Sequence, residues 1–139
     1  MIVSDVHDVA LTALFIDDEH VVMQARDEYA PTAPNMLAFF GGAMESGEDP
    51  RLAALRELKE ETTLEFDDID LVHIIDYPRP ENDGVMHLFA LKITSTNFEV
   101  KEGKGMSVVI LSEVPLENVA DGSRLGAIYL HRLKQKGVY

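Results

Sequence analysis

The sequence of 139 residues contains no cysteine, so neither a disulfide framework nor a thiolate metal site is expected. It also lacks an apolar run long enough to cross a membrane, and its first residues lack the basic-then-apolar layout of a signal peptide. Its content of 46% hydrophobic and 27% charged residues is typical of a globular chain rather than a disordered one. We therefore expect a single domain over residues 1–139, located in the cytoplasm.

Basic residues are scarce, with 12 Lys and Arg against 25 Asp and Glu, which gives a net charge of −13. Such a surface repels polyanions, so binding along DNA or RNA is not expected. The five histidines show no HxxxH or HExxH spacing, which argues against a zinc hydrolase. The remaining question is whether some of the many carboxylates are placed for chemistry.

The hydrophobic pattern predicts strands interspersed with two helices. The first helix is expected over Pro50–Thr62, because Asp49 is a good N-cap and proline suits the first helical position. A second helix is expected over Ser123–Lys136. The order of elements suggests an α/β sandwich with a mixed β-sheet. Strands are predicted over Asp8–Ile16, His20–Ala25, Ile69–Tyr77, Val85–Ile93 and Ser107–Leu111, a loop over Arg26–Asn35, and a short apolar run over Met36–Phe40.

Three carboxylates of the first helix are predicted to share one face. At 100° per residue, Glu57, Glu60 and Glu61 fall within an arc of about 100°. Clustering like charges is unfavourable, and Arg56 offsets only part of the repulsion through its i,i+4 relation to Glu60. Two interpretations remain open at this point. One is a solvated acidic face, and the other is a site for a hard divalent cation such as Mg²⁺.

The same geometry predicts which side of the helix is buried. Leu52, Leu55 and Leu58 fall opposite the carboxylates, where they could pack against a sheet. Ala53 falls among the carboxylates, where a small side chain would leave room for an ion or a ligand.

A glycine-bearing loop runs directly into this helix and favours the metal interpretation. Glycine permits backbone geometries that bring a main-chain carbonyl close to a metal. A chance match to all the positions of the pattern is on the order of one in 10¹⁰. These positions are Gly41, Gly42, Glu45, Gly47, Glu48, Arg56, Glu57, Glu60 and Glu61.

This segment resembles the Nudix box, Gly-x5-Glu-x7-Arg-Glu-apolar-x-Glu-Glu-x-Gly-apolar, over 23 residues. All positions but one match, and they are occupied by Gly42, Glu48, Arg56, Glu57, Leu58, Glu60, Glu61, Thr63 and Leu64. Thr63 replaces a glycine that normally ends the helix in a left-handed conformation. Because β-branched threonine disfavours positive φ, we expect the helix to end differently, a residue or two later.

The resemblance implies the Nudix-type α/β/α sandwich and a Mg²⁺-dependent hydrolase, with Mn²⁺ as a substitute ion. Such an enzyme cleaves a phosphoanhydride bond in a nucleoside diphosphate linked to a group X, by attack of metal-activated water on phosphorus. The roles implied for the matching positions are metal ligation by Glu57, Glu60, Glu61 and the carbonyl of Gly41, water activation by Glu57, and positioning of the carboxylates by Arg56 and Glu48.

Four residues outside the box are further candidates. Glu102, in a glycine-flanked loop before the last strand, could supply another metal ligand, or it could be an ordinary loop residue. Arg26 and Arg79 could bind phosphate, or they could be solvated loop arginines. Tyr77 could stack on a base, although a packed tyrosine at a strand end is the more usual outcome.

The residues that precede the paired glycines resemble a subset of the family with a Phe-Gly-Gly lead into the box. Because side chains alternate along a strand, we expect one of Phe39 and Phe40 in the core and the other, Phe40, in a substrate pocket.

An alternative to the enzyme is a non-catalytic Nudix-fold module that only binds a nucleotide. Retention of Glu57, Glu60 and Glu61 favours the enzyme over this module. The expected partner is a small nucleotide derivative, with no nucleic acid polymer and no membrane, and a homodimer is common among similar proteins. The group X stays open among nucleoside triphosphates, dinucleoside polyphosphates, nucleotide sugars and ADP-ribose.

Overall fold

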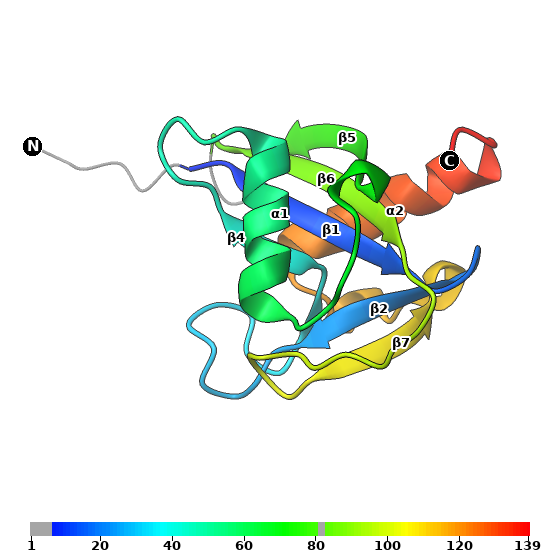
Figure 1. Ribbon diagram of the computed structural model, residues 1–139, viewed down its shortest axis with the longest axis horizontal. Coiled ribbons are helices and arrows are strands. Elements are labelled where there is room, and N and C mark those ends of the chain that lie inside the picture. The colour runs from blue at the N-terminus through cyan, green and yellow to red at the C-terminus, as the bar shows by residue number, and fades with distance from the viewer. Residues whose placement is uncertain (1–6, 81–82) are drawn as a thin grey trace, which may run out of the picture.

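The computed structural model describes residues 7–80 and 83–139 of the chain (Figure 1). Among these residues, neither α-helix is long and apolar enough to span a membrane. Short 3-10 turns cover Asp68–Asp70, Leu111–Glu113 and Leu116–Asn118. The main elements are β1 (Val9–Phe15), β2 (His20–Ala25), β3 (Leu37–Ala38), β4 (Phe40–Ala43), α1 (Pro50–Glu61), β5 (Val72–Pro78), β6 (Val85–Lys92), β7 (Met106–Ile110) and α2 (Asp121–Gln135).

The described strands form one mixed sheet with β1 near its centre. Five strands run in the order β3-β2-β1-β6-β5, and β4 and β7 pair additionally with β1 and β2, respectively. β1 is parallel to β6 and antiparallel to β2 and β4. The prediction of a mixed sheet is therefore confirmed. Because β4 pairs with β1 along Val9–Thr12, the paired glycines Gly41 and Gly42 are held in the middle of the sheet.

The two faces of the sheet carry separate cores, and β1 contributes to both. All seven of its residues are buried, and their side chains alternate between the two faces. Leu11 and Phe15 join the core that includes residues of α2, whereas Ala10 and Leu14 join the core that includes residues of α1. Figure 1 shows α1 in front of the sheet and α2 behind it. The α/β/α sandwich is confirmed.

The apolar run over Met36–Phe40 is divided between two strands, and this corrects one candidate. Phe39 lies between β3 and β4 and packs in the core on the α2 side, while Phe40 packs in the core on the α1 side. Phe40 has no exposed surface. The prediction that Phe40 forms a pocket wall is wrong, because both faces of this sheet are covered and alternation buries both rings.

The end of α1 also differs from the prediction. The helix ends at Glu61, earlier than expected, and Thr62 is extended with φ −137° and ψ 161°. The Thr62 hydroxyl donates to the Leu58 carbonyl at 2.8 Å. Thr63 then exchanges two hydrogen bonds with Glu99, one from each backbone N–H, at 2.9 and 2.7 Å. A strand-like exit needs no positive φ, so threonine fits where glycine was expected.

Candidate metal and substrate site

The face of α1 that packs against the sheet differs from the predicted one, and this determines where the helix carboxylates lie. Leu52 is 60% exposed, whereas Ala53 has no exposed surface and lies in the core. The predicted burial of Leu52 and the predicted open space at Ala53 are therefore both wrong. Small residues let the helix approach the sheet closely, so that Glu61 is itself buried at 4% exposure. The buried residues of α1 are Ala53, Ala54, Leu55, Leu58 and Glu61.

The paired glycines of β4 make room for the helix carboxylates. A Cβ on Gly42 would stand 2.9 Å from Glu57 Oε1, so only glycine leaves this carboxylate against the strand. Gly41 has φ +147°, and a Cβ there would stand 2.0 Å from the Ala10 carbonyl oxygen. The Gly41 N–H donates to Glu61 Oε1 at 2.8 Å. The glycines therefore bring β4 and α1 together at two of the predicted ligands.

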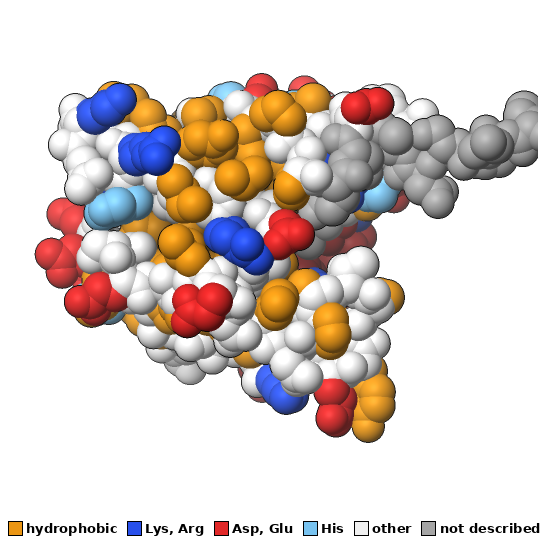
Figure 2. Space-filling view, turned by 180° about the vertical axis from the view of Figure 1, so that it is seen from behind, with side chains coloured by type: hydrophobic (Ala, Val, Ile, Leu, Met, Phe, Trp, Pro, Cys, Tyr) orange, Lys and Arg blue, Asp and Glu red, His pale blue; other side chains and the backbone are white. Residues whose placement is uncertain are grey.

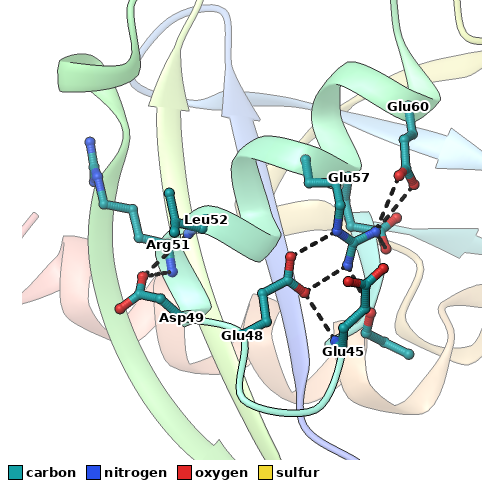
Figure 3. A network of polar contacts seen from close by, with 9 residues as sticks. Glu45, Glu48, Asp49, Arg51, Leu52, Glu57 and Glu60 are labelled. Carbon is teal, nitrogen blue, oxygen red and sulfur yellow. Dashed lines mark hydrogen bonds and ion pairs between the residues drawn. The ribbon is translucent and has the colours of Figure 1, made fainter.

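Figure 3 shows a polar network that includes Glu48, Glu57 and Glu60. The guanidinium group of Arg56 hydrogen-bonds to all three of these carboxylates. Its Nε and Nη2 donate to the two carboxylate oxygens of Glu48 at 2.8 and 2.9 Å, a bidentate ion pair. Its Nη1 donates to Glu57 at 3.1 Å and to both oxygens of Glu60 at 3.3 Å. Nη2 also reaches the Ala43 carbonyl at 3.2 Å. Arg56 thus holds three carboxylates in one arrangement.

This network fixes the ionised state of Glu48. The hydrogen bond from Arg56, helped by the Glu45 N–H, lowers the pKa of Glu48 to about 2. The pKa of Arg56 is raised, chiefly by its hydrogen bonds to Glu48. Both groups are therefore charged at neutral pH, as a positioning pair requires.

Glu57 and Glu61 experience the opposite electrostatic environment. Burial raises the pKa of Glu61 to about 8, with repulsion from Glu57 and Glu102 adding to the effect. Burial also raises the pKa of Glu57, against the attraction of Arg56 and with repulsion from Glu60 and Glu102. Both carboxylates are therefore harder to ionise than an exposed glutamate, and a cation bound beside them would favour their ionised forms.

The loop that carries Glu102 is attached to the end of α1. The Lys101 N–H donates to the Glu61 carbonyl at 2.7 Å, and Thr62 forms a β-bridge with Val100. The charge of Glu102 accordingly acts on both Glu57 and Glu61. Residues separated by some 40 positions in the sequence are brought to one site, as the predicted role of Glu102 requires.

The donor set at this site fits a hard divalent cation. Glu57, Glu61 and Glu102 offer oxygen atoms only, and their mutual repulsion is the kind of strain that a cation relieves. Within the described parts of the chain, no three acidic or histidine side chains are already grouped as a metal centre. Arg56 draws Glu57 and Glu60 toward itself, so ion binding requires side-chain adjustment there.

The two predicted arginines meet at one cavity beside the glycines. A cavity of about 160 Å³ is lined by Arg26, Arg79 and the Gly41–Gly42 backbone, and Phe39 rather than Phe40 borders it. Arg26 donates through Nε to the Thr32 carbonyl at 2.9 Å. Arg79 donates to the His7 carbonyl at 2.8 Å. Both guanidinium groups are therefore held by the protein.

Tyr77, the predicted base-stacking residue, belongs to the core. Its side chain is buried, its hydroxyl donates to the Gly122 carbonyl at 2.8 Å, and its ring centroid lies 5.2 Å from that of Tyr129. Burial raises the pKa of this phenol. A Cβ on Gly126 would stand 2.5 Å from the Tyr77 hydroxyl, so α2 packs directly over it. The prediction that Tyr77 binds substrate is wrong.

Sequence reasoning missed a second cavity, of about 280 Å³, next to the first. Arg26 lines both cavities. Gln24 and Tyr29 gave no motif signal, because their relation to Glu102 arises only when two loops fold together. The residues lining this cavity are Gln24, Arg26, Asp27, Tyr29, Ala30, Pro31, Glu102 and Gly103.

A protein-family model described as the NUDIX domain matches residues 6–127, which is most of the chain. The chain belongs to the Nudix family. The box predicted from sequence lies within the matched range, and in this Nudix protein it forms β4, the glycine loop and α1.

Two curated relatives resemble the chain. One is the methanol dehydrogenase activator of Bacillus methanolicus, which is 29% identical over 86 residues, covering 62% of this chain and 46% of the relative. The other is the ADP-ribose pyrophosphatase of Bacillus subtilis, which is 27% identical over 112 residues, covering 81% of this chain and 60% of the relative. The chain thus spans about half the length of the curated relatives it matches.

A solved structure with the same fold is that of a bifunctional NMN adenylyltransferase/ADP ribose pyrophosphatase from Francisella tularensis. The TM-score is 0.71 with 16% sequence identity, over 94% of this chain and 42% of that chain. At this identity the likeness supports the Nudix fold alone.

Proposed function

We propose that this Nudix protein is a hydrolase that cleaves a phosphoanhydride bond in a nucleoside diphosphate linked to a group X. The observation that carries the proposal is the position of the Gly41–Gly42 backbone. On one side it contacts the repelling carboxylates of Glu57 and Glu61, and it also lines the cavity that holds Arg26 and Arg79. A diphosphate can therefore contact cationic side chains while its phosphorus atoms lie beside a divalent-cation site.

The ion would be held by the carboxylates of Glu57, Glu60, Glu61 and Glu102 and by the Gly41 carbonyl, with Mg²⁺ as the resident ion and Mn²⁺ as a substitute. When bound, the ion would lower the pKa of a water molecule that it coordinates and would neutralise charge on the phosphoryl oxygens. The chemistry of the donor set is what supports this assignment, since all five groups present oxygen.

Glu57 is the residue we assign to orient the attacking water and accept its proton. Its carboxylate lies against Gly42, and burial raises its pKa, which makes it a stronger proton acceptor than an exposed carboxylate. Arg56 and Glu48 act through other groups as positioning residues, since the ion pair between them fixes where Arg56 presents its remaining N–H groups to Glu57 and Glu60. A side chain so oriented costs less to organise during the reaction.

One curated relative supports a nucleotide substrate, since it is named as an ADP-ribose pyrophosphatase. In a chain of charge −13, Arg26 and Arg79 are the residues we assign to phosphate, because a local cationic pair is needed to offset the overall repulsion of an anion.

The test is a hydrolysis screen with coupled phosphate release over ADP-ribose, nucleotide sugars, dinucleoside polyphosphates and nucleoside triphosphates, with Mg²⁺ and with EDTA. Glu57→Gln and Glu61→Gln are expected to lower turnover by about 10²-fold or more. Glu45→Gln is the matched control, since its exposed side chain lies outside the cluster. Unchanged turnover in both variants would refute the mechanism. Nucleotide binding without hydrolysis of any compound would instead support the binding module.

A further inference from the structure

An aromatic side chain stands exposed on the loop between β2 and β3. Tyr29 is 85% exposed, the largest exposed fraction among the large hydrophobic residues described. The loop projects from the body of the molecule at the lower left of Figure 1, and it projects again from the lower edge in the view from behind in Figure 2. A large aromatic ring left in water invites the question of what covers it.

The loop itself is firmly held despite its position. Its two ends are joined by the hydrogen bond from the Arg26 N–H to the Met36 carbonyl at 2.9 Å. The Asn35 N–H donates to the Asp27 carbonyl at 3.1 Å, and Asp27 Oδ1 accepts the Tyr29 N–H at 2.9 Å. The backbone at Tyr29 is therefore held by hydrogen bonds. This reduces the conformational entropy that the loop loses when a ligand packs against the ring.

A second loop braces the first from the side of the candidate metal site. Lys104 Nζ donates to Asn35 Oδ1 at 2.9 Å, and the Lys104 N–H donates to the Ala25 carbonyl at 2.8 Å. A Cβ on Gly103 would stand 2.4 Å from the same Ala25 carbonyl oxygen, so the backbone of this loop lies in close contact with the end of β2. The position of Tyr29 relative to Glu102 is therefore set by the fold.

Tyr29 lines the cavity of about 280 Å³ together with Gln24, Arg26 and Glu102. Arg26 also lines the cavity that holds Arg79 and the paired glycines. Because Arg26 lines both cavities, a group attached on the Arg26 side of a diphosphate bound by the two arginines would lie beside Tyr29. The flat face of a phenol accepts a nucleobase of any sequence, because every base has a π-face.

We propose that Tyr29 is the stacking surface for the nucleobase of the substrate, and therefore a specificity-determining residue that selects nucleotides over base-free sugar phosphates. This proposal rests on the proposed function for the location of the phosphates. Gln24, a buried residue that lines the same cavity, would offer an amide donor and acceptor to such a base.

The chain contains no tryptophan, so Tyr29→Trp places a single indole at the proposed stacking surface. We expect at least one of the nucleoside 5′-monophosphates AMP, GMP, CMP and UMP to quench its fluorescence. Ribose 5-phosphate, which carries the same phosphate without a base, is expected to leave the emission unchanged. Quenching of equal strength by ribose 5-phosphate, or no quenching by any of the four nucleotides, would overturn the proposal.

Calorimetric titration of the same nucleotides supplies the second measurement. Tyr29→Ala is expected to weaken binding about tenfold to a hundredfold, and Tyr29→Phe is expected to bind as the wild-type protein does. Glu28→Ala is the matched control, because this exposed neighbour in the same loop does not line the cavity. Equal affinities of Tyr29→Ala and Glu28→Ala, with both variants folded by circular dichroism, would refute the stacking role.

Kinetics separate this proposal from the proposed function. With a hydrolysed substrate, Tyr29→Ala should raise KM about tenfold or more with little change in kcat, because stacking is equal in the ground and transition states. A fall in kcat without a change in KM would contradict it. If nothing is hydrolysed but nucleotide binding still depends on Tyr29, the hydrolase assignment fails and the stacking surface stands.

Discussion

Replacing Glu61 by glutamine should stabilise the metal-free protein at alkaline pH. Glu61 is 4% exposed and its carboxylate accepts the Gly41 N–H at 2.8 Å. Its pKa in the folded protein is about 8, against an ordinary value of 4.5. Because the folded state binds this proton more tightly, the contribution of Glu61 to stability is fully present below pH 4.5 and is lost as pH rises through 8. Glutamine carries no charge and keeps an oxygen for Gly41.

The size of the effect follows from the proton affinities. Each tenfold difference in affinity is worth about 1.36 kcal/mol, so the ionised Glu61 costs at most about 5 kcal/mol at pH 9. Rearrangement of side chains and counter-ions around the new charge reduces this, and we expect about 2 kcal/mol. For a domain of this size the gain corresponds to roughly 8 °C in Tm. At pH 5 the gain should fall well below half of that.

Thermal unfolding in EDTA at pH 5 and pH 9 measures the difference directly. Glu117→Gln removes the same charge from an exposed site and should leave Tm nearly unchanged at both pH values. Added Mg²⁺ should raise the Tm of the wild-type protein and raise that of Glu61→Gln much less. The reasoning fails if Glu61→Gln is destabilised at pH 9, or if its gain is the same at pH 5 and pH 9.

Three further predictions concern the same cluster. Gly42→Ala places a Cβ against Glu57 Oε1, so Mg²⁺ affinity measured by calorimetry should fall about tenfold to a hundredfold, with Tm lowered by only a few degrees. Arg56→Lys keeps the charge but cannot pair bidentately with Glu48, so kcat should fall by a similar factor in steady-state assays. Protons compete with the ion at Glu61, so calorimetric Mg²⁺ affinity should fall about tenfold per pH unit below about 8 and be flat above it.

The sequence predicted the elements and the local chemistry of the box well. The cap by Asp49 is present, with its Oδ1 accepting the N–H groups of Arg51 and Leu52 at 2.9 and 3.3 Å. The predicted pairing of Arg56 with Glu60 is also present. These features depend on residues close in the chain, where spacing along a helix determines which side chains meet.

The buried face of α1 could not be predicted in the same way. Hydrophobicity favoured Leu52 as a buried residue, but the close approach of the helix to β4 selects Ala53 and Ala54 instead. Likewise, alternation along a strand assigns side chains to two faces but does not tell whether both faces are covered. In this sandwich they are, which is why Phe40 and Tyr77 are core residues.

Contacts between loops that are distant in the chain could not be predicted from the sequence. Arg26 and Arg79 were both proposed, but nothing in their spacing indicated one shared cavity. The cavity beside Tyr29 requires the loop after β2 to meet the loop before β7, and such tertiary contacts have no periodic signal.

The loop that carries Glu102 has a consequence for engineering. It is bonded to the end of α1 through Lys101, and to the end of β2 and the neighbouring loop through Lys104. If residues 26–35 alone were replaced by the corresponding loop of a related protein, the hydrogen bond from Lys104 to Asn35 would be lost. The loop that carries Glu102 would then be displaced, and its carboxylate would move away from Glu57 and Glu61. Exchange of substrate preference between related proteins should succeed only when residues 26–35 and 101–105 are grafted together as one unit.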